Sequence, residues 1–170
     1  MTELSTPAGR LPTAAAAFPD RPRGTVIVSS VASDSHTWNL VFLQLLIEEC
    51  GYEVVNLGPC VPDELLVAEC LAHDPEMVVI SSVNGHGYQD GMRVIELLRE
   101  RAELEETPVV IGGKLGTDGP EGVSRVLELT RAGFDAVFED GQDPVANFRT
   151  FLDAGPQAEL TRGDTLRISA

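Results

Sequence analysis

Between residues 24 and 154 the chain alternates short apolar runs with longer segments whose apolar residues recur every three or four positions. Short runs rich in Val and Ile are typical of strands, and the longer spacing is typical of amphipathic helices. The pattern predicts strands over residues 25–30, 53–57, 77–82, 108–112 and 136–138. It predicts helices over residues 40–50, 63–73, 89–104, 120–132 and 144–154.

This alternation predicts an α/β domain with a single doubly wound parallel sheet of five strands and helices on both faces. The first four runs have the compact apolar character of strands buried on both faces, and the short fifth run suits a sheet edge. A flavodoxin-like (Rossmann-like) strand order, 2-1-3-4-5, would place a ligand crevice at the carboxyl ends of the first and third strands.

The length of 170 residues suits one domain, which we assign to residues 24–154. Residues 1–23 mix Pro, Ala, Gly and Thr without periodicity, and residues 155–170 are polar with scattered charge. We predict that both of these segments are tails without fixed structure.

Charge and cysteine content exclude several classes of protein. A net charge of −15, from 27 acidic and 12 basic side chains, opposes binding to nucleic acid and to anionic membranes. The start of the chain does not read as a signal peptide, and no run approaches the ~20 apolar residues of a membrane span, so we predict a cytoplasmic protein. Cys50, Cys60 and Cys70 form no C-x-x-C pair, which predicts free, buried thiols.

The loop after the first strand carries the most chemistry. Asp34 and His36 stand two residues apart, a spacing that lets a histidine bind a metal through one ring nitrogen while the other donates to a carboxylate. The alternative is an ordinary helix N-cap, with Asp34 or Thr37 capping the next helix and His36 solvated. Trp38, taken by itself, is more typical of a packing residue than of a platform for stacking on a ligand.

Two later loops are rich in small residues. Ser81, Gly85 and Gly87 follow the third strand without forming a dinucleotide-binding fingerprint, and the nearby His86 is typical of a solvated or capping residue. Gly112-Gly113-Lys114 follows the fourth strand and does not match a P-loop. Paired glycines there allow either the close approach of a ligand or simply a tight turn.

Two other families with this architecture fail at their defining loops. A phosphoacceptor receiver domain needs an acidic pair after the first strand and an acceptor Asp after the third, but the third strand is followed by no carboxylate before Asp90. A flavodoxin needs a Ser/Thr/Gly-rich phosphate loop after the first strand, where His36 and Trp38 stand instead.

Taken together, Asp34-x-His36-x-x-Asn39, Ser81-x-Val83 and Gly112-Gly113 resemble the signature of the cobalamin-binding domain family, D-x-H-x-x-G, S-x-L and G-G. Residues 51–58, 61–65 and 79–82, with Gly85 and Gly87, most closely resemble the small subunits of glutamate mutases (methylaspartate mutases). Asn39 and Val83 depart from the motif. Asn adopts left-handed dihedrals more readily than other non-glycine residues, and Val keeps an apolar lining.

The resemblance implies that adenosylcobalamin binds with its benzimidazole displaced and with His36 as the lower ligand of cobalt. Asp34 would hold the His36 ring, and Ser81, Val83 and the glycine pair would line the slot for the nucleotide tail. The implied cofactor-binding residues are Asp34, Ser35, His36, Thr37, Trp38, Asn39, Ser81, Val83, Gly85, Gly87, Gly112 and Gly113.

By the same resemblance, this chain is the cofactor-carrying subunit of an isomerase that interconverts glutamate and 3-methylaspartate. A separate barrel-type subunit would bind the amino-acid substrate, and the present chain would be inactive without it. The loops bearing Asp34, His36, Gly85 and Gly87 would face that partner. The alternatives are a non-catalytic corrinoid module, either a methyl carrier or a cobalamin sensor, and a flavodoxin-like interaction module that has lost its cofactor.

Overall fold

The computed structural model describes residues 22–116, 122–139 and 143–155. Its centre is a five-stranded sheet in the order β2-β1-β3-β4-β5, with every neighbouring pair parallel. The strands are β1 (Thr25–Ser30), β2 (Glu53–Asn56), β3 (Met77–Ser82), β4 (Val109–Gly113) and β5 (Ala136–Glu139). The predicted fold class and strand order are therefore confirmed.

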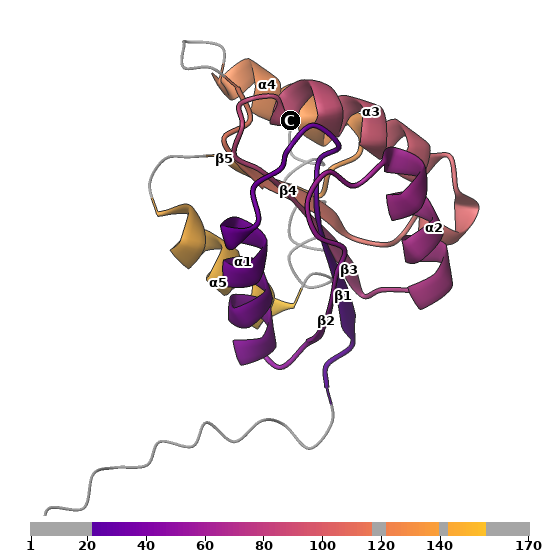
Figure 1. The fold of residues 1–170 in the computed structure, drawn as a ribbon, viewed down its shortest axis with the longest axis vertical. Helices are drawn as coiled ribbons and strands as arrows, with labels where there is room; N and C mark the ends of the chain where they lie inside the picture. Colours follow the sequence, from indigo (N-terminus) through magenta and orange to yellow (C-terminus); the bar gives the residue numbers. More distant parts are fainter. Residues whose placement is uncertain (1–21, 117–121, 140–142, 156–170) are drawn as a thin grey trace, which may run out of the picture.

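Helices cover both faces of this sheet (Figure 1). They are α1 (Trp38–Glu49), α2 (Asp63–His73), α3 (Gly87–Arg99), α4 (Gly122–Ala132) and α5 (Pro144–Ala154). α1 and α5 pack on one face, and α2, α3 and α4 pack on the other. The described residues include no helix long and apolar enough to span a bilayer.

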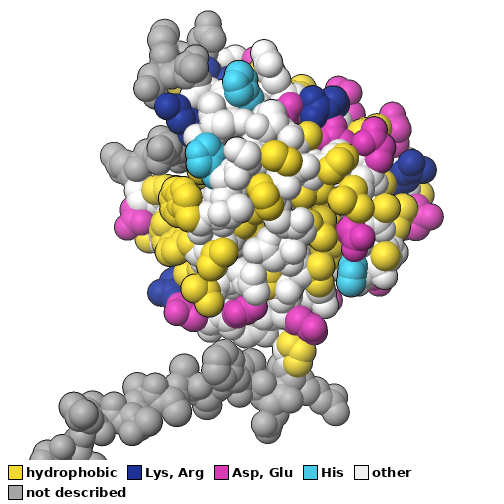
Figure 2. All heavy atoms as spheres, viewed as in Figure 1, with side chains coloured by type: hydrophobic (Ala, Val, Ile, Leu, Met, Phe, Trp, Pro, Cys, Tyr) yellow, Lys and Arg dark blue, Asp and Glu magenta, His cyan; other side chains and the backbone are white. Residues whose placement is uncertain are grey.

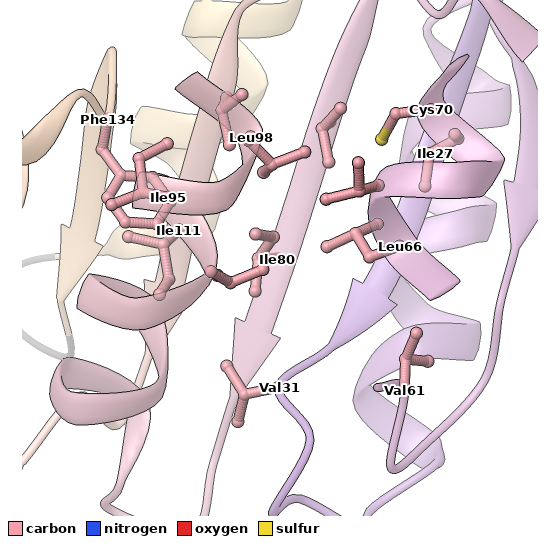
Figure 3. Packing of buried hydrophobic residues seen from close by; sticks show 14 of the residues in the cluster. Ile27, Val31, Val61, Leu66, Cys70, Ile80, Ile95, Leu98, Ile111 and Phe134 are labelled. Carbon is pink, nitrogen blue, oxygen red and sulfur yellow. The ribbon is translucent and has the colours of Figure 1, made fainter. Parts of the chain in front are cut away.

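The alternation of side chains along each strand supplies a core to each face. In β3, Val78 and Ile80 join the core under α2 and α3, whereas Met77 and Val79 join the core under α1 and α5. Figure 3 shows part of the first core, in which Leu66 of α2 and Ile95 of α3 pack over strand residues such as Ile80. Burial on both faces explains why the central strands read as continuous apolar runs.

Two features differ from the sequence-based expectation. The predicted helix 89–104 is interrupted: α3 ends at Arg99, and a separate 3₁₀ turn, Ala102–Leu104, buries Leu104 in the core. Arg99 stabilises that break by donating hydrogen bonds to the carbonyls of Leu104 and Thr107. β2 is an edge strand and only half-buried, and it is not buried on both faces as predicted.

Glycines and a capping side chain mark several helix ends. Gly51 and Gly133 follow α1 and α4 with φ of 88° and 126°, conformations that favour glycine. The Asp143 side chain accepts a hydrogen bond from the Ala146 N–H at 3.0 Å and so caps α5. The predicted start of α4 at residue 120 lies outside the described residues.

The cysteines and chain ends are only partly as predicted. All three cysteines are free, but only Cys70 is buried, because Cys60 lies in the exposed loop between β2 and α2. Arg23, assigned from the sequence to the N-terminal tail, packs on the domain: its guanidinium lies 4.8 Å from the centre of the Tyr52 ring and donates to the Leu152 carbonyl. Residues 1–21 and 156–170, which make up nearly all of the two predicted tails, lie outside the described part of the chain.

Candidate functional site

Asp34 is the buried centre of the loop between β1 and α1. Its residue is 0% exposed, and its carboxylate accepts three hydrogen bonds. One oxygen accepts from the His36 backbone N–H at 3.0 Å and from the His36 Nδ1 at 2.7 Å. The other accepts from the Val83 N–H at 2.6 Å, which ties this loop to the one after β3. Asp34 therefore does not cap α1, and the capping alternative fails for this residue.

The electrostatics of this site keep Asp34 ionised. Burial raises the pKa of the Asp34 carboxyl, but the hydrogen bonds from Val83 and His36 outweigh burial and bring the pKa below its ordinary value of 3.8. An ionised carboxylate only accepts hydrogen bonds, so the proton between it and His36 resides on Nδ1.

His36 is held by one ring nitrogen and left open at the other. Its side chain is 49% exposed, and its Nε2 has no hydrogen-bond partner among the described residues. With the proton on Nδ1, Nε2 carries a free lone pair. This is the arrangement of a metal-ligating imidazole whose second nitrogen is fixed by a carboxylate.

Further hydrogen bonds fix the loop that contains Asp34 to neighbouring segments. The Asp34 carbonyl accepts from the Cys60 N–H at 2.8 Å and from the Ser30 hydroxyl at 3.2 Å. The Ser33 hydroxyl donates to Asp90 of α3 and accepts from Asn84 at 3.0 Å. The loop is thus fastened to the segments after β2 and β3, so the position of His36 is set by several strand ends at once.

Beside this loop, a groove of about 490 Å³ opens between α1 and α5 over the ends of β3 and β4. Its volume lies within the range of about 300–1,000 Å³ that small-molecule sites occupy. Six of the predicted residues line it: Trp38, Asn39, Ser81, Val83, Gly112 and Gly113. The structure therefore brings together parts of all three predicted loops.

The residues that α1, α5 and β5 contribute to this groove were not predicted from the sequence. They are mostly aliphatic and aromatic: Phe42, Leu43, Leu46, Phe138, Pro144, Val145 and Phe148. A signal was available in α1, which is apolar on nearly all sides and leaves Trp38, Val41, Phe42 and Leu45 exposed. Figure 2 shows hydrophobic side chains gathered on this part of the surface. Such a cluster is typical of a ligand or partner site.

Asn39 does not adopt the left-handed backbone conformation that the sequence suggested. It lies in the first turn of α1 and is absent from the residues with positive φ, so it does not replace glycine by adopting a left-handed conformation. It is 5% exposed, and its Nδ2 donates to the Ser81 hydroxyl oxygen at 2.7 Å. Its Oδ1 is buried without a hydrogen-bond partner in the described structure.

The remaining predicted residues do not line the groove. Ser35 and Thr37 are exposed beside His36. Gly87 is the first residue of α3, where an added Cβ would lie 2.7 Å from the Ser82 Cβ. Gly85 lines a second, more polar pocket of about 640 Å³, together with His86, Tyr88, Arg125 and Glu128. That pocket is the larger one, yet of the predicted residues only Gly85 lines it.

The described residues contain no cluster of three or more His, Cys, Asp or Glu side chains that could hold a bare metal ion. What the site offers is one imidazole nitrogen next to an apolar groove. Such a site suits a metal whose other ligands come from an organic ring system.

Comparisons with known proteins agree with this geometry. The family model described as "B12 binding domain" matches residues 24–149. Glutamate mutase sigma subunit 1 of Haloarcula marismortui is 30% identical over 146 residues, which are 85% of this chain and 93% of that protein. Dimethylamine corrinoid protein 1 of Methanosarcina mazei is 25% identical over 76% of this chain and 56% of that protein.

Among solved structures, the methanol:cobalamin methyltransferase complex of Methanosarcina barkeri superimposes with a TM-score of 0.60 at 24% identity. That match covers 82% of this chain and 48% of the other chain. At this level of identity the likeness supports the fold alone.

Proposed function

The chain belongs to the B12-binding domain family, and from this premise we propose that it is the cobalamin-carrying subunit of an adenosylcobalamin-dependent carbon-skeleton mutase. The reaction we propose is the interconversion of glutamate and 3-methylaspartate, carried out with a separate barrel-type subunit. The observation that carries the proposal is the Asp34–His36 pair: a half-exposed imidazole held at 2.7 Å by a buried carboxylate, beside an apolar groove.

The residues present fit a cobalamin. The exposed His36 Nε2 would supply a single nitrogen ligand to the cobalt of the corrin. The groove between α1 and α5 suits the displaced nucleotide tail in size and in apolar character. The buried, unpartnered Asn39 Oδ1 on its wall is a further sign of a site completed by a ligand.

In this proposal each residue has a distinct task. Asp34 keeps the proton on His36 Nδ1, so that Nε2 remains a donor to the metal. Ser81, Val83, Gly112 and Gly113 line the tail slot with the α1 and α5 side chains. Ser35, Thr37 and Gly85 would face the corrin at the carboxyl edge of the sheet, and the buried Gly87 would let α3 begin close to Ser82 behind them. Adenosylcobalamin, when bound, supplies radical chemistry that begins at its cobalt–carbon bond.

The coverage of the relatives favours the mutase over the methyl-carrier alternative. The chain spans 93% of a glutamate mutase sigma subunit but only 56% of a dimethylamine corrinoid protein. The higher identity to the sigma subunit, 30% against 25%, also supports the mutase and the barrel partner that it would need.

Cobalamin binding is tested by titrating the purified protein with adenosylcobalamin and recording absorbance spectra. We expect the spectrum of base-off, histidine-ligated cobalamin for the parent protein and its loss in His36→Ala. His73→Ala is the matched control, because His73 is an exposed histidine at the end of α2 that lines neither pocket. Absence of binding by the parent protein would overturn the proposal.

The substrate assignment needs a second experiment. The protein is combined with a barrel-type mutase subunit, and the pair is assayed for methylaspartate formation from glutamate. Turnover that requires both chains and adenosylcobalamin supports the mutase. A pair that binds the cofactor without isomerising glutamate, together with methyl transfer to or from the bound cofactor, would favour the carrier instead.

A further inference from the structure

We propose that Asn39 is a positioning residue that turns the Ser81 hydroxyl proton toward the nucleotide base of a bound corrinoid. This inference rests on the proposed cobalamin-binding function. It concerns the one position in the Asp34–Asn39 loop where the chain departs from the family motif. The amide at this position thereby gains a role that glycine cannot fill.

The hydrogen bond between Asn39 and Ser81 has a defined direction. Asn39 Nδ2 donates to Ser81 Oγ at 2.7 Å, so it occupies an acceptor site of the hydroxyl. Both residues are 5% exposed, and water does not compete for this bond. A hydroxyl has a single proton to donate, and the contact with Asn39 leaves that proton directed elsewhere.

The proton of the Ser81 hydroxyl is left without a partner inside the described structure. Among the described residues the Ser81 hydroxyl has no acceptor, although the neighbouring Ser82 hydroxyl donates to Asn84 Oδ1 at 3.1 Å. Ser81 lies on the wall of the groove at the end of β3. The unused donor therefore faces the space that we assign to the nucleotide tail.

The nucleotide base of a corrinoid offers an acceptor that matches the Ser81 donor. A benzimidazole base that is displaced from cobalt has a ring nitrogen whose lone pair has lost its metal. In an apolar groove that lone pair needs a donor, because a buried polar atom without a partner is costly. Ser81 is the hydroxyl on this wall, and Asn39 prevents it from turning its proton away.

The unpartnered Asn39 Oδ1 is an independent sign that this pair is incomplete without a ligand. Nearly all buried polar atoms in folded proteins have partners, and exceptions gather at functional sites. Here a donor on Ser81 and an acceptor on Asn39 are both unsatisfied within one hydrogen-bonded pair. The ligand class that satisfies the donor is a nitrogen-containing aromatic base.

The test uses two substitutions at position 39 in the full-length protein. Asn39→Asp keeps the shape but presents only acceptors, so the Ser81 proton turns toward residue 39 and away from the groove. Asn39→Gly restores the motif residue and lets the hydroxyl rotate freely. Affinity is measured by absorbance titration with cobalamin and with cobinamide, a corrinoid that lacks the nucleotide tail.

We expect Asn39→Asp to weaken cobalamin binding by roughly tenfold, the equivalent of one hydrogen bond, and Asn39→Gly by roughly threefold. Cobinamide affinity should change by less than about twofold, since it does not reach Ser81. The histidine-ligated spectrum of the bound cofactor should persist in both variants. A purely structural defect would instead weaken both corrinoids equally.

A double-mutant cycle decides the inference even where cobinamide binds too weakly to measure. Ser81→Ala should cost about as much as Asn39→Asp, and the double variant should lose little more, because both changes remove the same donor. Additive losses, or tight cobalamin binding by Asn39→Asp, would overturn the role of Asn39. Failure of the parent protein to bind cobalamin would overturn the proposed function, which is a separate outcome.

Discussion

The two faces of the sheet share the same strands but differ in how their helices close over them. On the face covered by α2 and α3, the core is continuous and includes fully buried residues such as Leu66, Ile95 and Leu98. On the other face, α1 and α5 bury their inner side chains but leave the groove of about 490 Å³ between them at the carboxyl end of the strands.

The two faces differ because α3 and α1 distribute their apolar side chains differently. α3 has a clear apolar side that faces the sheet and a charged side that faces solvent. α1 is apolar on most of its surface, including exposed residues that the core does not need. One face of the domain therefore serves stability, and the other trades some packing for a place to bind a ligand.

The strongest test of this comparison is a pair of truncations on the two faces. Leu98→Ala removes a 0% exposed side chain from the closed face and should lower the free energy of unfolding by about 3–5 kcal/mol. Phe42→Ala removes a 44% exposed side chain from the groove and should cost about 1 kcal/mol. Urea denaturation measures both.

Cobalamin affinity should reverse that ranking. Phe42→Ala should weaken binding by roughly tenfold, whereas Leu98→Ala, measured well below its unfolding midpoint, should change it by less than about twofold. If the two variants weakened cobalamin binding equally, the hypothesis that only the α1 and α5 face binds the ligand would be wrong.

A pair of glycine substitutions tests the rigid part of the groove wall. Gly113 has φ of 101°, and an added Cβ would lie 2.2 Å from the Ser82 carbonyl oxygen. Gly58 has φ of 83° but nothing within 4 Å of such a Cβ. We expect Gly113→Ala to cost about 3 kcal/mol, from strain plus the clash, and Gly58→Ala about 1 kcal/mol, from strain alone. Equal losses in thermal and urea unfolding would contradict the close approach of β4 to β3.

Acid titration separates the polar loop from the apolar core. The lowered pKa of Asp34 means that its carboxylate stabilises the folded state above the unfolded pKa of about 3.9 and loses that contribution as pH falls through the lower folded value. Asp34→Ala should therefore cost about 2 kcal/mol at pH 7 and progressively less below about pH 4. The deficit of Leu98→Ala should not depend on pH. A loss of stability in Asp34→Ala that did not change with pH would contradict an ionised Asp34 carboxylate.

The smallest effect is expected for an exposed ion pair between α5 and α1, the two helices that flank the groove. Arg149 pairs with Glu49, and both side chains are at least half-exposed. Arg149→Ala should change stability by less than about 0.5 kcal/mol, because exposed pairs are screened by water and salt. Arg99 on the closed face is the contrasting arginine: it is mostly buried and donates to Gly133 and Asp135, and its truncation should cost several times more. Comparable losses would show that α1 and α5 are held together by charge.

Much of this architecture could be predicted from the sequence. The bounds of β1, β3, α2 and α5 match the predicted ranges, because strand and helix periodicities are local properties of the chain. The break after Arg99 was missed because apolar spacing continues through Leu104, and only the contacts of Arg99 with distant carbonyls show why the helix ends there.

The site was predictable to a similar degree. The pairing of Asp34 with His36 follows from a short loop between fixed elements, and the structure bears out the contact at 2.7 Å. That the Val83 N–H would complete the carboxylate, or that Asn39 would reach Ser81, could not be read from spacing, since these contacts join residues more than forty positions apart.

By itself, the amino-acid sequence determined the order and type of the elements, the placement of three motif loops at successive strand ends, and a resemblance to one family. Only the tertiary structure decided that α1 and α5 leave a groove at those strand ends and that Asp34 is buried and ionised. It also decided that Asn39 enters α1 and binds Ser81, where the sequence suggested a left-handed turn. The physical reason is that burial, groove volume and long-range hydrogen bonds depend on how helices pack across the sheet, which no local pattern encodes.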